Sequence, residues 1–346
     1  MKGNFFLGNG AFELRDMEQR KLQPNEVRIR NMAAGVCGTD VHIYHGDKGS
    51  ADVIPPVVLG HEYSGLVLEI GENVHKVKVG DHVCVDPNRY CGNCTFCLNG
   101  QKQLCEHLYA VGVNENGGFA QESIVPENQC FKLSRDVDWS AGAMAEPISC
   151  CLHGMDQIKI HQGDTVAIIG GGAIGLLFVQ LCRLSGASFI VVSEPIAFRR
   201  NVALKVGADV CAEPSTVAET IAQGTNGRGV DVIIECSGST KAAQQTIALA
   251  RRGTRILFFA VPSPEAAISL PLFDVYQKEL SIVGSFINLD TFERAVRLLN
   301  NHRLQTKPII THTYPLENVE DAIRMQMSDE SLKVMIFPNG KDGATV

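Results

Sequence analysis

The sequence predicts an α/β protein with two domains, one β-rich and one built on a doubly wound parallel sheet. At 346 residues the chain is longer than one hydrophobic core usually serves. Residues 25–145 consist of short β-rich runs separated by glycine, proline and asparagine, whereas residues 150–285 alternate strand-like with helix-like segments. This change near residue 150 marks the boundary between the two domains.

The β-rich domain is expected to contribute strands at residues 27–30, 64–70, 82–85 and 119–125. In the second domain we expect strands at 166–169, 189–193, 230–235, 255–260 and 281–284, with helices at 201–206 and 242–250. Residues 289–300 and 319–327 have helical patterns, and residues 333–336 form a last strand that we expect to return to the first domain.

The composition excludes several classes of function. With 45% apolar and 20% charged residues the chain is globular. Its net charge is −7 and it contains no lysine- or arginine-rich run, so we expect no nucleic-acid partner. We find no secretory signal pattern in the first residues, and the twelve cysteines therefore indicate a reduced, cytoplasmic protein rather than a disulfide framework.

Residues 165–182 carry no charge and approach the length of a membrane span. Three consecutive glycines, 170–172, divide this stretch into a β-rich half and a helix-like half, so we expect a strand, a tight turn and a helix rather than a membrane segment. Gly170, Gly172 and Gly175 form G-x-G-x-x-G at this turn. That context predicts a dinucleotide site, because the glycines let a pyrophosphate approach the backbone at the helix N-terminus.

The second strand of this domain ends at Glu194, close to the offset of about twenty residues at which an acid binds the adenine-ribose diol. A carboxylate there would repel a 2′-phosphate, which favours NAD as the cofactor. Arg199 and Arg200 follow closely and are the residues that would receive such a phosphate, so NADP is the alternative.

The first domain carries four closely spaced cysteines, Cys91, Cys94, Cys97 and Cys105, in the order C-x2-C-x2-C-x7-C. Four thiolates in one short segment close the coordination shell of a tetrahedral ion, which is how structural zinc is usually held. An iron–sulfur cluster is the rival interpretation, but a bacterial cluster motif would close with a C-x3-C-P step that this segment lacks. We therefore expect structural zinc.

A second set of metal donors lies in the same domain, in the motifs Cys37-Gly38-Thr39-Asp40-Val41-His42 and Gly60-His61-Glu62. A catalytic zinc needs three protein ligands and one open position. Cys37 and His61 are the first two candidates, and either Glu62 or Glu146 is the third. Adjacent residues on a strand point to opposite faces, so His61 and Glu62 both reach one ion only if the backbone bends there.

Taken together, the motifs resemble the zinc-dependent medium-chain dehydrogenase/reductase family, and within it the sorbitol, polyol and threonine dehydrogenase branch. The residues that carry the resemblance are Cys37–His42, Gly60–Glu62, the four cysteines, Gly117–Ala120, Glu146–Pro147, Gly170–Gly175 and Val283–Phe286. They span most of the chain in the family's order. The resemblance implies a GroES-like catalytic domain made of residues 1–148 and 289–346, around a Rossmann domain of residues 149–288.

The resemblance also implies roles for single residues. A catalytic zinc on Cys37, His61 and Glu62 or Glu146 lowers the pKa of a bound hydroxyl, so that its carbon can release hydride to the nicotinamide. Thr39 matches the family's proton-relay hydroxyl, and His42 is the candidate that passes the proton outward. The remaining implied residues are NAD contacts: Ile174, Glu194, Arg199, Val261 and Phe286.

The expected function is oxidation, by NAD, of a secondary hydroxyl of a polyol or sugar derivative to a ketone. Sorbitol dehydrogenases usually continue Gly-Ser-Phe with Arg-Tyr, whereas Phe286 is followed here by Ile287 and Asn288, which weakens the case for sorbitol itself. L-Threonine or a vicinal diol is the alternative substrate. A non-catalytic dinucleotide-binding protein is the alternative of a different class. The resemblance also implies a homodimer or homotetramer, paired through residues 281–286.

Overall fold

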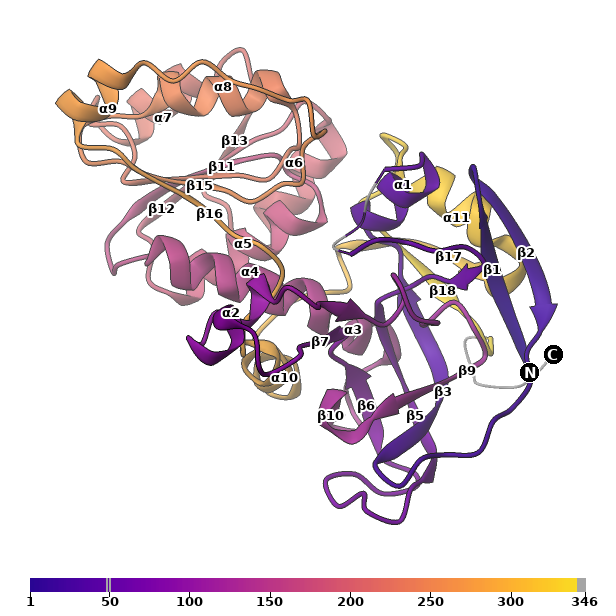
Figure 1. The fold of residues 1–346 in the computed structure, drawn as a ribbon. Helices are drawn as coiled ribbons and strands as arrows, with labels where there is room; N and C mark the ends of the chain where they lie inside the picture. Colours follow the sequence, from indigo (N-terminus) through magenta and orange to yellow (C-terminus); the bar gives the residue numbers. More distant parts are fainter. Residues whose placement is uncertain (48, 50, 341–346) are drawn as a thin grey trace. The chain divides into compact units, whose positions relative to one another are not determined.

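The computed structural model describes residues 1–47, 49 and 51–340. The chain divides into two compact units, Met1–Ser149 with Ile287–Val346, and Cys150–Phe286. The boundaries between the units follow Ser149 and Phe286, whereas the boundaries expected from the sequence follow residues 148 and 288. The first unit is therefore assembled from both ends of the chain, which are indigo and yellow in Figure 1.

Over the described residues, the first unit contains a seven-stranded sheet with the order β10-β6-β5-β3-β18-β17, in which β9 also pairs with β3. Its strands are β3 (Glu26–Gly35), β5 (Glu62–Ile70), β6 (His82–Val85), β9 (Glu122–Pro126), β10 (Cys130–Leu133), β17 (Ile310–Pro315) and β18 (Lys333–Phe337). A second sheet has the order β2-β1-β4, from β1 (Lys2–Gly8), β2 (Ala11–Asp16) and β4 (Val57–Val58), and β7 (Asn88–Arg89) pairs with β8 (Tyr109–Ala110).

Strand β3 is the centre of this unit because β5, β9 and β18 all pair with it. Its apolar side chains, among them Val27 and Ile29, are fully buried in the core. Strand β18 runs antiparallel to β3, with Met335 opposite Gly35. The last predicted strand thus lies in the sheet of the first unit.

Short helices interrupt this unit, so the prediction of an all-β region was incomplete. They are α1 (Gly38–Tyr44), α2 (Thr95–Leu98) and α3 (Trp139–Ala143), with the 3-10 turns η1 (Lys102–Leu104) and η2 (Glu127–Gln129). Helices this short complete too few turns to produce a recognisable apolar period. The C-terminal segment adds α10 (Phe292–Asn300), η3 (Leu316–Asn318) and α11 (Val319–Gln326).

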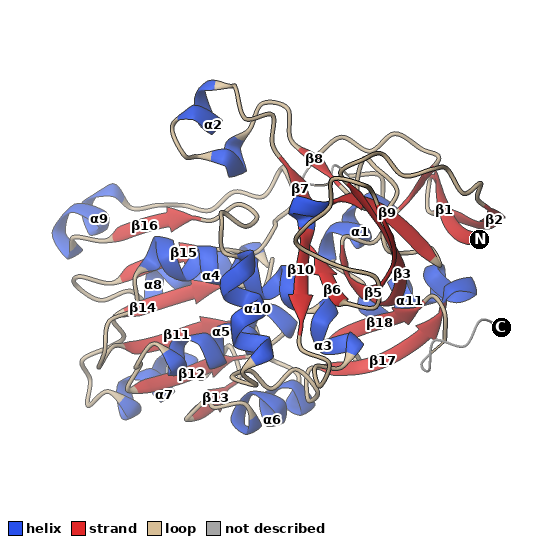
Figure 2. Cartoon of the chain, turned by 90° about the horizontal axis from the view of Figure 1, so that it is seen from below, coloured by secondary structure: helices blue, strands red, loops and turns tan. Residues whose placement is uncertain are grey.

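The second unit is the predicted parallel sheet with helices on both faces. Over the described residues it has six strands in the order β13-β12-β11-β14-β15-β16, as Figure 2 shows from bottom to top. They are β11 (Thr165–Ile169), β12 (Phe189–Ser193), β13 (Val210–Ala212), β14 (Val232–Glu235), β15 (Arg255–Phe258) and β16 (Ser281–Gly284). All neighbouring pairs are parallel. Every predicted strand of this domain is confirmed, with ends shifted by a few residues.

The helices of the second unit are α5 (Ala173–Leu184), α6 (Ala197–Lys205), α7 (Val217–Gly224), α8 (Thr240–Leu249) and α9 (Leu272–Lys278). Helix α4 (Ala145–Ile158) runs across the boundary between the units. Figure 1 shows α7 and α8 on one face of the sheet and α5 on the opposite face. This is the doubly wound arrangement, in which ligands bind outside the carboxyl ends of the strands.

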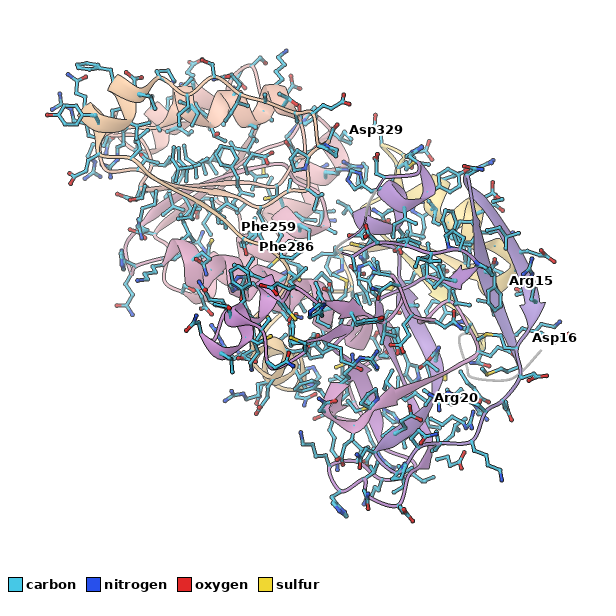
Figure 3. The ribbon with its side chains drawn as sticks, in the orientation of Figure 1. Arg15, Asp16, Arg20, Phe259, Phe286 and Asp329 are labelled. Carbon is cyan, nitrogen blue, oxygen red and sulfur yellow. The ribbon has the colours of Figure 1, made fainter. Side chains whose placement is uncertain are left out.

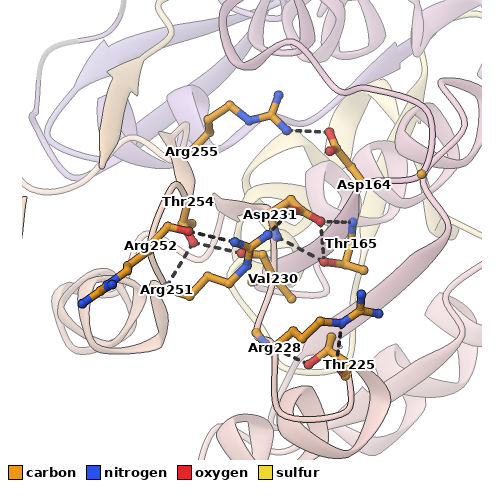
Figure 4. Close-up of polar contacts among 12 residues, drawn as sticks. Asp164, Thr165, Thr225, Arg228, Val230, Asp231, Arg251, Arg252, Thr254 and Arg255 are labelled. Carbon is orange, nitrogen blue, oxygen red and sulfur yellow. Dashed lines mark hydrogen bonds and ion pairs between the residues drawn. The ribbon is translucent and has the colours of Figure 1, made fainter. Parts of the chain in front are cut away.

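The amino ends of the strands are tied together by charged side chains (Figure 4). Asp231, just before β14, accepts hydrogen bonds from the backbone N–H and hydroxyl of Thr165 at 2.9 and 2.8 Å and pairs with Arg251. Arg255 at the start of β15 pairs with Asp164 at 2.6 Å. These contacts hold together the amino ends of the strands, whereas the glycine turn lies at the carboxyl end of β11.

The uncharged stretch 165–182 forms β11, the glycine turn and most of α5. Within the described part of the chain, no helix is both long and apolar enough to cross a membrane.

Candidate functional site

Three of the predicted metal ligands lie together in the first unit. Cys37 follows β3 and is the N-cap residue of α1, His61 precedes β5, and Glu62 is the first residue of β5. The ladder between β3 and β5 pairs Gly35 with Glu62, which brings the end of β3 next to the start of β5. The ligand atoms of Cys37, His61 and Glu62 all lie within 4.8 Å of one another.

A bend before His61 accompanies this arrangement. Gly60 has a φ of +92°, a conformation that glycine adopts without a steric cost. A side chain at Gly60 would also collide with the ring of Phe119, since a Cβ atom would lie 2.5 Å from it. The Gly60 carbonyl accepts a 2.6 Å hydrogen bond from the N–H of Gly118, which holds the bend in place. Such a bend is needed for the side chains of the consecutive residues His61 and Glu62 to face one ion.

The donor set fits a catalytic zinc. A thiolate, an imidazole and a carboxylate are typical ligands of a zinc ion that keeps its fourth position open. Among the described residues, His61 Nδ1 is buried and has no hydrogen-bond partner, which is unusual for a buried polar atom. Glu146, in the first turn of α4, is outside the 4.8 Å set, but its charge acts on His61.

Two buried charged residues surround these ligands that sequence reasoning did not identify as site residues. Asp40 accepts a 2.8 Å hydrogen bond from the backbone N–H of Cys37, and its other oxygen lies 3.7 Å from His61 Nδ1. Lys333, the first residue of β18, forms an ion pair with Glu62 Oε2. Burial opposes the charged form of His61, but the charges of Cys37 and Asp40 outweigh it and raise the pKa of His61 well above its usual value.

The proposed proton-relay residues are both on α1. The Thr39 hydroxyl lies 3.7 Å from the Cys37 sulfur, within hydrogen-bonding reach of a thiol. His42 lies one turn further along, where its Nδ1 is 3.4 Å from Asp47 Oδ2 and its side chain is partly exposed. The helix therefore runs from the candidate metal ligand Cys37 toward a partly exposed imidazole.

The four cysteines of the second predicted metal site also converge. The sulfur atoms lie within 4.8 Å of one another, with 3.9 Å between Cys91 and Cys97 and 4.0 Å between Cys94 and Cys105. A tetrahedral zinc with Zn–S bonds of about 2.3 Å places its sulfurs about 3.8 Å apart. The spacing therefore fits a single tetrahedral ion.

Backbone N–H groups favour the thiolate form in part of this cysteine cluster, whereas burial raises the pKa of Cys97 to about 12. The N–H of Cys94 donates to the Cys91 sulfur at 3.3 Å, and the N–H groups of Cys91 and His107 donate to the Cys105 sulfur at 3.3 and 3.4 Å. Hydrogen bonds from the backbone of Cys97 and Glu106 lower the pKa of Cys94 below that of an ordinary thiol. Stabilised thiolates are the form that binds metal.

The glycine turn of the second unit has the geometry that its motif predicts. Gly170 has a φ of +107°, and a Cβ at Gly175 would lie 1.9 Å from the Gly170 carbonyl oxygen, so both positions require glycine. Gly172 caps α5, and a Cβ there would meet no atom within 4 Å, which leaves the backbone open to a ligand. Helix α5 therefore presents free N–H groups next to an open surface, as a pyrophosphate site requires.

Glu194 lies at the end of β12, beside this turn. Its carboxylate accepts hydrogen bonds from the N–H groups of Gly171 at 2.7 Å and Ile196 at 3.0 Å, and the residue is buried. Arg200 donates to the Glu194 carbonyl and pairs with Glu213, while the Arg199 guanidinium lies 5.9 Å from the centre of the Phe198 ring. The structure thus places Glu194 at the glycine turn, where a ribose next to the pyrophosphate would lie.

The other predicted cofactor contacts lie on this unit as well. Ile174 is in the first turn of α5, and Val261 follows β15 with an exposed side chain. Phe286, labelled in Figure 3, follows β16 and is 42% exposed. A cavity of about 350 Å³ lies at the carboxyl ends of β14 and β15, and Glu235, Ala260 and Pro262 are among the residues that line it.

Comparisons with known proteins identify similar chains. The alcohol dehydrogenase GroES-like domain matches residues 23–135, and the zinc-binding dehydrogenase domain matches residues 173–301. The sorbitol dehydrogenase of Halalkalibacterium halodurans is 33% identical over 96% of this chain and 97% of its own length. The L-threonine 3-dehydrogenase of Bacillus subtilis is also 33% identical, over 95% of this chain and 96% of its own length. The structure of a zinc-binding dehydrogenase from Sinorhizobium meliloti, solved with NADP, superposes with a TM-score of 0.93. It is 36% identical in sequence, and the match covers 97% of this chain and 99% of that one.

Proposed function

This chain belongs to the family of zinc-binding alcohol dehydrogenases with a GroES-like domain, and we propose that it oxidises a secondary hydroxyl of a polyol or sugar derivative to a ketone with NAD as the hydride acceptor. The observation that carries this proposal is the convergence of Cys37, His61 and Glu62 within 4.8 Å, in a chain whose other unit carries the glycine turn beside Glu194.

In the proposed site, Cys37, His61 and Glu62 would hold the catalytic metal, with Glu146 as a further carboxylate nearby. Zinc there supplies a Lewis acid that lowers the pKa of a substrate hydroxyl. The Thr39 hydroxyl would accept the substrate proton while it donates its own proton onward, and His42, which lies on the same helix with a partly exposed ring, would pass a proton to solvent. Asp40 would orient His61 from the side of Nδ1.

Substrates that carry a secondary hydroxyl are favoured by the names of the relatives. Relatives named sorbitol dehydrogenase and D-arabinitol dehydrogenase support a polyol, and those named L-threonine 3-dehydrogenase support threonine at the same identity of 33%. We favour a polyol over threonine because the E-P segment at Glu146 resembles bacterial sugar-alcohol dehydrogenases. L-Threonine is the second candidate.

A substrate panel tests the proposal. Zinc-replete protein would be incubated with NAD and, one at a time, with sugar alcohols, sugar phosphates, L-threonine and vicinal diols, and NADH would be followed by absorbance. We expect turnover with a polyol and little with threonine. Turnover of threonine alone would select the second candidate, and the absence of turnover with any secondary alcohol would contradict the proposed function.

Cofactor choice is proposed to depend on the negative charge of Glu194. We expect Glu194→Gln to lower the preference for NAD over NADP, measured as the ratio of kcat/KM values, by about tenfold, because one repulsive charge next to the 2′-phosphate is removed while the carboxamide oxygen still accepts a backbone hydrogen bond.

Glu219→Gln is the matched control for this measurement, because Glu219 is an exposed residue of α7 whose carboxylate accepts a hydrogen bond from Gln223. It should leave the cofactor ratio unchanged. An unchanged ratio in Glu194→Gln, or a wild-type preference for NADP such as the ligand of the Sinorhizobium meliloti structure suggests, would contradict this use of Glu194.

We also propose that copies of the chain associate through the outer strand of the second unit. Strand β16 is at the edge of the parallel sheet, where its backbone can pair with another strand. The preceding helix α9 exposes three large apolar side chains, those of Leu272, Phe273 and Tyr276. Light scattering should give the mass of a dimer or tetramer, and a monomer at micromolar concentration would contradict this proposal.

A further inference from the structure

A lysine side chain is buried against the proposed metal ligand Glu62. The side chains of Lys333 and Glu62 are only 5% and 1% exposed, and the lysine Nζ forms an ion pair with Oε2. Among the described residues, that oxygen accepts no hydrogen bond from any other group. Lys333 is therefore a cation in direct contact with the Glu62 carboxylate.

The fold of the first unit provides space for this ion pair. Glu62 on β5 and Met335 on β18 both lie opposite Gly35 of the central strand β3. Lys333 is two residues before Met335, so its side chain is on the same face of the sheet as that of Met335. The two charged side chains meet over Gly35, since a Cβ there would lie 2.2 Å from Glu62 Oε2 and 2.8 Å from Lys333 Cε.

Stability alone does not account for the pair. Burying two charges costs solvation free energy that their attraction often fails to recover, and apolar residues of similar size usually serve a core equally well. The pair also lies among further ionisable groups, because the charges of Cys37 and Asp40 act on Lys333 together with that of Glu62. Its location points to the metal site.

We propose that Lys333 is a positioning residue that competes with the metal for the Glu62 carboxylate, and so keeps Glu62 a weak, exchangeable ligand. The inference rests on the metal site proposed above. A carboxylate that is neutralised by an ammonium group is a poorer donor, and a fixed positive charge next to the site also opposes a second cation. Without Lys333, Glu62 would have the metal as its main counter-charge and would bind it more tightly.

The test measures how fast zinc leaves the catalytic site. Protein loaded with zinc is mixed with a coloured chelator, and Cys37→Ser identifies which of the two release phases belongs to the catalytic site. In Lys333→Met we expect this phase to be slower by about tenfold, the order of magnitude by which residues behind a ligand change metal binding. The phase of the four-cysteine site should stay unchanged, which provides an internal control.

A double-mutant cycle shows whether the effect acts through Glu62. In a Glu62→Gln background, Lys333→Met should change the release rate by less than about twofold, since the carboxylate that the lysine neutralises is absent. Lys333→Gln is the second variant, which keeps a polar group over Gly35. With cobalt bound at the catalytic site, the absorption spectrum of Lys333→Met should differ from that of the wild type. The spectrum of the double variant should match that of Glu62→Gln.

The outcomes separate the inference from the proposed function. Faster or unchanged release in both Lys333 variants would overturn the inference, as would a slowing that persists in the Glu62→Gln background. A wild-type protein that holds zinc only at the four cysteines would overturn the inference and the proposed catalytic site together. If zinc binding requires Cys37 and release is independent of Lys333, the proposed site stands and the inference fails.

Discussion

Replacement of Cys37 by serine is expected to abolish dehydrogenase activity and to remove one of two bound zinc ions. Cys37 supplies the single sulfur of the three-residue ligand set, and a serine hydroxyl is a much weaker donor to zinc at neutral pH. A Lewis acid contributes several kcal/mol to the stabilisation of developing negative charge, so kcat/KM should fall by at least about 10³-fold. The fold should be retained, because Cys37 is a partly exposed residue at the start of α1.

Elemental analysis and steady-state kinetics on the same preparation check this expectation. Cys211→Ser is the matched control, because Cys211 is also a partly exposed free cysteine but lies on β13 of the other unit. It should retain both zinc ions and full activity. If Cys37→Ser kept its activity, or lost activity while keeping two zinc ions, the proposed ligand set would be wrong.

Local sequence patterns predicted the helices and strands that are long or that are bounded by glycine. The uncharged stretch 165–182 was resolved into β11 and α5 because the glycines between them have an unambiguous physical role at a tight turn. The family resemblance carried by the same motifs is confirmed by the match of both domains. The hairpin of β1 and β2 was not predicted, since its turn at Gly8–Gly10 follows only a short apolar run.

The sequence predicted those site residues that belong to short motifs of metal-binding side chains, and it did not predict the others. Cys37, His61 and Glu62 come from two motifs that β3 and β5 bring together. Lys333 is about 270 residues from Glu62 in the sequence, and a lysine at the start of an apolar strand has the pattern of an exposed strand end. Its burial depends on the pairing of β18 with β3 and on the missing side chain of Gly35, which no local pattern records.

The second large effect is expected at the four-cysteine cluster, where Cys94→Ser should release the other zinc ion and unfold the segment from Cys91 to Cys105. This segment has almost no core of its own, because α2 and η1 contain no buried residue. A structure without buried apolar contacts depends on its metal for order, and a metal site of this type contributes most of the folding free energy of its segment. Loss of one thiolate therefore removes the main stabilising interaction.

Limited proteolysis would measure this loss directly. Cleavage within residues 91–105 should accelerate by at least about tenfold in Cys94→Ser, because cleavage follows the population of locally opened chains. Leu98→Ser is the matched control in the same helix, since Leu98 is exposed and contributes no sulfur. The control should keep two zinc ions and the wild-type cleavage rate. Equal cleavage rates for Cys94→Ser and the wild type would show that the segment is held by contacts other than the metal, among them the 3.0 Å ion pair between Lys102 and Asp290.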